Sequence, residues 1–161
     1  MPDVNSLLHA IEPGFFQQAF VVADITEARH ACVALGCDEF VEVPPSDLEY
    51  NLRGETVSAA LALAFGRSGN VQIELIQPIR GQSLHSEFLA SNGPGVHHRG
   101  FLVDDLDEAA SGGDTLGFPT LMHGDFGRLR FCYLDTWNAL GIYTELVEDP
   151  DGLLMSVMPW R

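Results

Sequence analysis

The sequence predicts an α+β protein in which one structural module is used twice. A strand-like segment that ends at Asp24 and continues into a helix-like segment returns 81 positions later, around Asp105. A second pair of strand-like segments, VQIELIQP at 71–78 and IYTELVEDP at 142–150, ends the two halves. Internal repetition of this kind indicates a repeated folding unit. Each half is therefore predicted to contain a strand, a helix and two or three further strands.

The first predicted helix begins after Asp24, whose carboxylate can cap the free backbone N–H groups of a helix start. Apolar residues then recur at intervals of three or four, as one buried helix face requires (Ile25, Ala28, Cys32 and Leu35). Gly36 follows, and glycine readily adopts the left-handed conformation that ends many helices.

The second predicted helix begins after Asp105 and ends at Gly117, at the same offset. Ser111-Gly-Gly interrupts it, and glycine costs about 1 kcal/mol per helical position relative to alanine, so we expect fraying or a break there. The polar, turn-rich segment 81–95 is predicted to connect the halves, with a helical turn at 88–90. The expected organisation is one domain over 1–161, with modules at 14–80 and 95–150.

The length and charge of the chain disfavour several classes of function. The chain has 161 residues, of which 46% are hydrophobic, and eight Lys and Arg against 23 Asp and Glu give a net charge of −15. Such a charge repels nucleic acid and anionic membrane surfaces. No apolar run approaches the roughly 20 residues of a spanning helix, and the first residues lack the pattern of a secretory signal. We expect a cytoplasmic protein with no nucleic-acid or membrane partner.

Several residue types with reactive side chains are assigned structural roles. Three cysteines without a CxxC spacing are typical of buried thiols in a reducing compartment (Cys32, Cys37 and Cys132). Four histidines are expected in loops or on the surface (His9, His30, His85 and His123). The tail 153–161 is apolar enough to dock, for example at a homodimer contact.

Four polar side chains occupy matching places in the two halves. Strand alternation puts Gln17 and His98 on the face away from the helices, each followed two residues later by a very small residue that leaves room for a ligand. Glu74 and Glu145 lie inside apolar strand segments, where a carboxylate is costly to bury unless it is paired or binds a metal; an exposed edge position is the alternative. His97 falls on the opposite strand face and is expected to pack or to support a ligand.

These paired strand–Asp–helix starts and paired IELIQP and YTELVEDP endings resemble the vicinal oxygen chelate superfamily. The group includes glyoxalase I, methylmalonyl-CoA epimerase, extradiol dioxygenases and bleomycin-resistance proteins. The most specific part of the resemblance is GVHHRGFLVDDLDEA at 95–109. The resemblance implies two βαβββ modules forming a cup-shaped, half-open mixed sheet, with two metal ligands from each module. By position these are Gln17, Glu74, His98 and Glu145, a set similar to that of zinc-type glyoxalase I.

The donor set is chemically consistent with a divalent ion. Three oxygen donors and one imidazole suit Zn, Ni, Co, Mn or Mg, and two carboxylates would balance the charge of the ion. Gln17 stands where a two-His, one-carboxylate iron site needs a second histidine, so a dioxygenase is disfavoured. The few cations disfavour glutathione and CoA substrates, although four arginines are either surface charges or binders of one carboxylate (Arg53, Arg80, Arg128 and Arg130).

The sequence therefore predicts a metal-dependent lyase or isomerase/epimerase that acts on a small, fairly apolar carbonyl or vicinal-oxygen substrate. The expected chemistry is proton removal beside a carbonyl, with a metal-stabilised enolate and Glu145 or Glu74 as the catalytic base. Three aromatic residues either line the cup or pack in the core (Tyr133, Trp137 and Tyr143). The alternative function is a non-catalytic, resistance-type protein that sequesters a small molecule, since a fold alone does not decide function.

Overall fold

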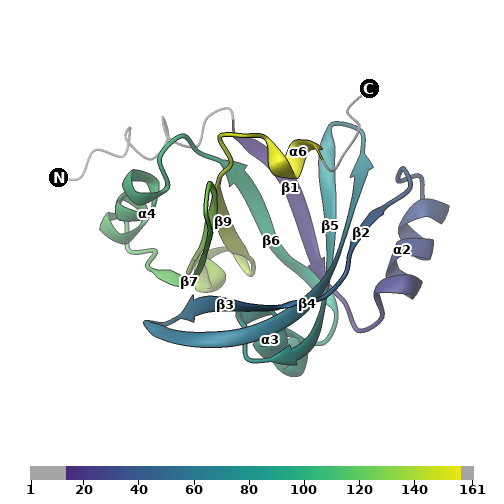
Figure 1. Cartoon of the computed structure of the whole chain (residues 1–161), viewed down its shortest axis with the longest axis horizontal. Coiled ribbons are helices and arrows are strands. Elements are labelled where there is room, and N and C mark those ends of the chain that lie inside the picture. The colour runs from purple at the N-terminus through teal and green to yellow at the C-terminus, as the bar shows by residue number, and fades with distance from the viewer. Residues whose placement is uncertain (1–13, 157–161) are drawn as a thin grey trace.

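The computed structural model describes residues 14–156, and in them the strands form one mixed sheet (Figure 1). The strands are β1 (Phe15–Val21), β2 (Val41–Val43), β3 (Asp47–Leu52), β4 (Glu55–Ser68), β5 (Val71–Gly81), β6 (Gly95–Leu102), β7 (Thr120–Phe126), β8 (Leu129–Leu134) and β9 (Tyr143–Glu148). The helices are α2 (Ile25–Ala34), α3 (Leu84–Asn92), α4 (Leu106–Thr115), α5 (Trp137–Leu140) and α6 (Leu153–Ser156). None of these helices has the length and apolar character needed to cross a membrane.

The strand order β2-β4-β3-β7-β8-β9-β6-β1-β5 joins the two halves through their first strands. β1 pairs antiparallel with β6, and each of them pairs in parallel with the last strand of its own half, β5 or β9. The sheet is strongly curved, because β4 also pairs with β5 and β3 reaches β7 at Asn51 and Leu52. The α+β fold with a curved mixed sheet is as the sequence predicts, and β2 is a short additional strand of the first half.

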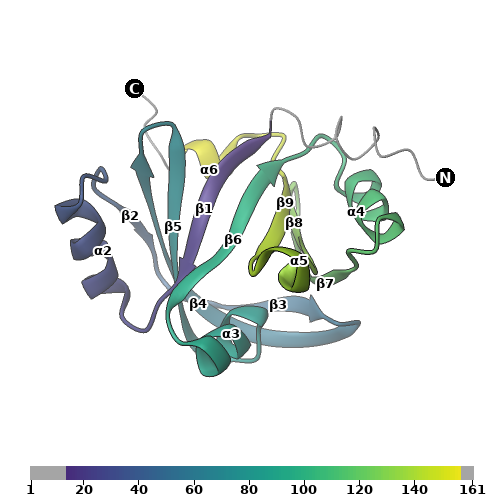
Figure 2. The same ribbon diagram turned by 180° about the vertical axis from the view of Figure 1, so that it is seen from behind.

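Two helices cover the outer face of the sheet, one for each half (Figure 2). Asp24 caps α2 by accepting hydrogen bonds from the backbone N–H groups of Thr26 and Glu27, and Asp105 caps α4 in the same way through Glu108. α2 packs on side chains of β1, β4 and β5, and α4 packs on β8 and β9. Ile25, Ala28 and Cys32 form the contact face of α2 as predicted, but the burial predicted for Leu35 is wrong, because Leu35 follows the last helical residue and is 88% exposed. The apolar sides of β1 and β6 that face these helices leave the other sheet face free for the site.

The predicted break in α4 is wrong. The helix runs through Gly112 and Gly113 to Thr115. A Cβ atom at Gly113 would lie only 2.8 Å from Leu134 Cδ1 on β8. The glycine therefore lets the helix approach the sheet closely, and this packing outweighs the helix propensity that glycine lacks.

The connection between the halves is more ordered than a helical turn at 88–90. It forms α3, a nine-residue helix that begins with a capping box between Ser83 and Ser86. Leu84, His85 and Phe88 of this helix are buried. The loop position expected for His85 is therefore wrong. The loop expected for His123 is wrong too, because this exposed residue lies in β7, whereas His30 is on the surface as expected. His9 and residues 157–161 of the tail lie outside the described residues.

Candidate metal centre

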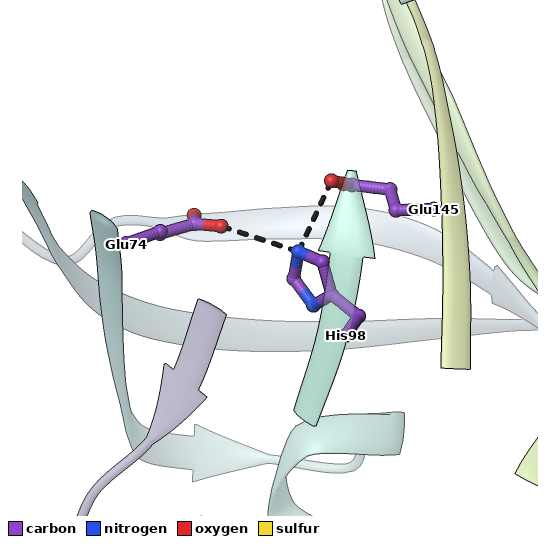
Figure 3. Close-up of side chains that lie close together, drawn as sticks. All are labelled: Glu74, His98 and Glu145. Carbon is purple, nitrogen blue, oxygen red and sulfur yellow. Dashed lines mark ion pairs between the residues drawn. The ribbon is translucent and has the colours of Figure 1, made fainter. Parts of the chain in front are cut away.

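Four adjacent strands place the four candidate ligands together on the inner face of the sheet. Gln17 lies on β1, Glu74 on β5, His98 on β6 and Glu145 on β9, which are neighbours in the order β5-β1-β6-β9. All four residues are buried, with 0 to 7% of their surface exposed. Figure 3 shows Glu74, His98 and Glu145 directed toward one another, so the exposed-edge alternative for the carboxylates does not apply.

The four side chains converge on one atom. Nε2 of His98 lies 3.0 Å from Oε1 of Gln17, 3.1 Å from Oε2 of Glu145 and 3.5 Å from Oε2 of Glu74. Potential ligand atoms of Glu74, His98 and Glu145 all lie within 4.8 Å of one another. A Cβ atom at Gly100 would lie 3.0 Å from Gln17 Oε1, so a glycine here keeps the space beside these oxygens open. One imidazole nitrogen and three oxygens so placed fit a divalent ion.

Burial and mutual charge set the protonation states of the cluster. Burial raises the pKa of Glu74, and the adjacent His98 offsets only part of this effect. Burial alone would lower the pKa of His98, but the carboxylates of Glu145 and Glu74 outweigh it and raise this pKa to about 9. Without an ion, the His98 imidazolium therefore provides the positive charge between the two carboxylates. A bound cation would take over that role.

A chain of amides fixes the orientation of Gln17. The backbone carbonyl of Leu154 in α6 can only accept a hydrogen bond, and Nε2 of Gln72 donates to it at 3.2 Å. Oε1 of Gln72 is therefore directed at Gln17, whose Nε2 donates to it at 2.7 Å. The carbonyl oxygen of Gln17 is left to face His98 and the candidate ion. Gln72, which is fully buried, has no counterpart in the repeat pattern, and the sequence analysis missed it.

The strand face predicted for His97 is wrong. Both His97 and His98 lie opposite Ala19, because β6 contains a bulge between the pairs Ala19–His98 and Phe20–Val96. A bulge breaks the alternation of side chains, so His97 lies beside His98 instead of on the helix-covered face. Their Nδ1 atoms are 2.9 Å apart, and one of the two therefore carries the shared proton. The expected supporting role of His97 agrees with this contact.

His85 is a further buried histidine near the cluster, and it lines the same cavity as Gln17, Glu74 and Glu145. Its Nε2 lies 2.9 Å from the hydroxyl of Tyr133, and its ring centroid lies 4.8 Å from that of His97. Burial, reinforced by the charge of His98, lowers the pKa of His85 to about 3, and burial lowers the pKa of His97 well below its usual value. Both rings are neutral. The Ser83–Ser86 spacing of the α3 capping box was the sequence signal that could have placed His85 on a helix.

A cavity of about 280 Å³ opens in front of the cluster, and Gln17, Glu74 and Glu145 form part of its wall. Tyr133 also lines it, as one of the two alternatives from the sequence allows. Trp137 and Tyr143 do not line it and instead pack against each other, with ring centroids 5.3 Å apart. The remaining wall is mainly aliphatic and aromatic, so the polar cluster lies at one end of an apolar chamber.

This combination of repeated half, curved sheet and convergent polar cluster agrees with the comparison to known families. The family described as the glyoxalase/bleomycin resistance protein/dioxygenase superfamily matches residues 16–133. The chain belongs to this superfamily. Among curated proteins, no sequence matches.

Solved structures share the fold at low sequence identity. Methylmalonyl-CoA epimerase from Mycobacterium tuberculosis is 23% identical, with a TM-score of 0.61 over 88% of this chain and 91% of that one. A hypothetical protein from Bacillus halodurans C-125 is 20% identical, with a TM-score of 0.62 over 85% and 94% of the two chains. A methylmalonyl-CoA epimerase bound to methylmalonyl-CoA and NH4+ is 24% identical, with a TM-score of 0.58 over 86% and 95%. At these identities the likeness establishes the fold.

Proposed function

We propose that this protein is a metal-dependent lyase or isomerase/epimerase that removes a proton beside a carbonyl of a small substrate with neighbouring oxygens. The observation that carries the proposal is the convergence of three buried oxygen donors on Nε2 of His98 at one end of a cavity. Gln17, Glu74, His98 and Glu145 would hold Zn, Ni, Co, Mn or Mg. Such an ion polarises a carbonyl oxygen and stabilises an enolate.

The carboxylates of Glu145 and Glu74 are the proposed proton acceptors. Both line the cavity, so each can reach a substrate carbon held near the cluster. Glu145 is opposite Tyr133 in the β8–β9 register, and this aromatic neighbour gives it a drier surrounding. Burial raises the pKa of Glu74, and a raised pKa makes a deprotonated carboxylate a stronger base. The experiment below therefore compares the effect of replacing each of these two carboxylates.

The remaining polar residues hold the cluster in place. His97 supports His98 through the contact between their Nδ1 atoms, and Gln72 directs the carbonyl oxygen of Gln17 inward. The apolar cavity wall excludes water, which strengthens electrostatic interactions at the reacting carbon. A protein that only sequesters an apolar compound needs the cavity but gains nothing from two buried carboxylates.

The test is exchange of solvent deuterium into hydroxyacetone, followed by proton NMR with metal-loaded protein. Glu145→Gln should keep an oxygen donor and much of the metal but lose the base, so exchange should fall by about 10²- to 10⁴-fold. Glu74→Gln is measured in parallel, and the exposed Glu49→Gln is the matched control that should change nothing.

Metal analysis of each variant separates ligation from catalysis. About one transition metal per wild-type chain, after purification without added metal, supports the enzyme. If only Glu74→Gln abolishes exchange, the roles of the two carboxylates are reversed. Absence of metal together with absence of exchange would favour the sequestering alternative.

A further inference from the structure

The cavity wall away from the polar cluster is built for a hydrophobic group. Tyr50, Phe126 and Phe131 lie along it with ring centroids 5.7 to 6.1 Å apart, and aliphatic side chains from β4 and β5 complete it. None of the described residues that line the cavity is an arginine. The chamber can therefore stack or enclose an apolar ring or branched chain, and it offers no cation to an anionic one.

The rim of the cavity is also apolar. Val43 of β2, Leu48 of β3, Phe126 of β7 and Leu153 of α6 line the cavity and yet keep 38 to 49% of their surface exposed. A ligand arm that extends from the cluster toward solvent would thus pass between apolar side chains.

The arginines of residues 14–156 already have partners that do not line the cavity. The chain contains no lysine, and its eight cationic side chains are all arginines. Six of the seven arginines in residues 14–156 form ion pairs with carboxylates (Arg29, Arg53, Arg67, Arg80, Arg128 and Arg130). The seventh, Arg99, lies 4.3 Å above the ring of Phe15. The six paired arginines include the four that the sequence analysis considered as binders of a substrate carboxylate.

The carboxylates beside the rim already hold two of these arginines. Glu42, next to Val43, pairs with Arg29, and Asp47, next to Leu48, pairs with Arg80, while the chain as a whole carries a net charge of −15. An anionic substrate tail, such as the phosphates of a CoA thioester or the carboxylates of glutathione, would meet repulsion without a compensating cation. The two carboxylates of the cluster would be balanced by a divalent ion, which leaves no excess positive charge there.

Resting on the proposed function, we infer that the substrate of this site is an uncharged compound with a hydrophobic aryl or branched-alkyl arm beside its two oxygens. The oxygens lie at the end of the cavity formed by Gln17, Glu74 and Glu145. The arm lies against Tyr50, Phe126 and Phe131 and points toward the rim. A polyanionic carrier such as CoA is excluded as the substrate handle, although solved structures with this fold include CoA-ester epimerases.

Calorimetric binding to metal-loaded protein tests the inference with four defined probes. 1-Hydroxy-1-phenylpropan-2-one should bind at least about 10-fold more tightly than hydroxyacetone, which has the same oxygens and no arm. Its 4-carboxyphenyl derivative and propionyl-CoA should both bind at least about 10-fold more weakly than the uncharged phenyl compound. Equal binding of hydroxyacetone, or tighter binding of either anion, would overturn the inference.

A charge placed on the rim provides the matched variant. Leu48→Arg should weaken binding of the phenyl compound and strengthen binding of the 4-carboxyphenyl derivative, because it adds the missing cation. Leu35→Arg makes the same change at a site that is 88% exposed and away from the cavity, and it should alter neither. The same response in both variants would show that overall charge, rather than the rim, controls binding.

Two further measurements distinguish the remaining explanations. If the wild type sediments as a dimer and Leu48→Arg makes it monomeric without changing probe affinity, the rim covers a second copy and the inference is wrong. If the phenyl compound binds with the expected preference but exchanges no deuterium, the ligand class stands and the proposed enzymatic function fails. If deuterium exchange occurs but binding shows no preference for the apolar arm, the proposed enzymatic function stands and the inferred ligand class is wrong.

Discussion

Replacing Gln72 with leucine should weaken metal binding although this residue does not touch the candidate ion. Gln72→Leu removes the acceptor for Nε2 of Gln17, a buried hydrogen bond of 2.7 Å, and also the 3.2 Å bond to the Leu154 carbonyl. A buried donor left without a partner costs about 1 to 3 kcal/mol. For a chain of this size that corresponds to a loss of about 2 to 12 °C in Tm.

The metal affinity should fall as well, because Gln17 is then free to turn its NH2 group toward the cluster. Loss of a residue that orients a ligand typically weakens metal binding by about 10- to 100-fold. Competition with a chromophoric chelator measures this affinity, and thermal unfolding of the metal-free variant measures the stability loss separately.

Gln77→Leu is the matched control on the same strand. Oε1 of Gln77 accepts a hydrogen bond of 3.0 Å from the backbone N–H of Ile25 at the start of α2, and not from a residue of the cluster. This variant should lose stability and keep the wild-type metal affinity. An unchanged metal affinity in Gln72→Leu, or an equal loss in the two variants, would refute the orienting role.

Three further outcomes are expected. Removal of the ion with a chelator should lower the Tm, because binding to the native state contributes about 2.7 kcal/mol at one hundred times Kd; identical melting curves with and without added Zn, Ni, Co or Mn would count against a metal site. His98→Ala should reduce metal affinity far more than His97→Ala, since only His98 directs Nε2 at the three oxygens; titration of both variants with the same metal checks this, and similar losses would contradict it. The metal-free protein should lose stability on the order of 3 kcal/mol as the pH rises from about 6.5 to about 9. The reason is that the pKa of His98 is raised from 6.5 to about 9 in the folded state, so the stabilisation from its charged form is complete below this range and is lost across it. Denaturant unfolding across this interval measures the loss, and a His98→Gln variant with the same pH slope would refute the assignment to His98.

The repeat and the strand alternation were sufficient to predict that the four candidate residues lie together. Gln17, Glu74, His98 and Glu145 lie together because each occupies an inward-facing position on one of four adjacent strands. Alternation with period two and a shared offset carry that information. The capping residues of α2 and α4 could also be predicted from the sequence, because a capping carboxylate accepts hydrogen bonds from backbone groups only two or three positions away.

The missed features depend on contacts between distant segments. The bulge at His97 is defined by its pairing with β1, and an alternation pattern within β6 contains no sign of it. Gly113 appeared unfavourable because its partner, Leu134, comes from another strand. Gln72 obtains its role from a backbone carbonyl 82 positions away in α6. Local propensities do not encode such partners, whereas tertiary packing does.

The antiparallel pairing of β1 with β6 makes the candidate centre a junction between the two halves of the chain. Each half carries an incomplete set of donors, Gln17 and Glu74 in one and His98 and Glu145 in the other. Neither half alone can coordinate an ion with four protein ligands, so ion capture reports that both have folded and docked. An ion bound there would cross-link the two halves at the β1–β6 pairing. Binding of the ion should therefore slow amide hydrogen exchange along these two strands.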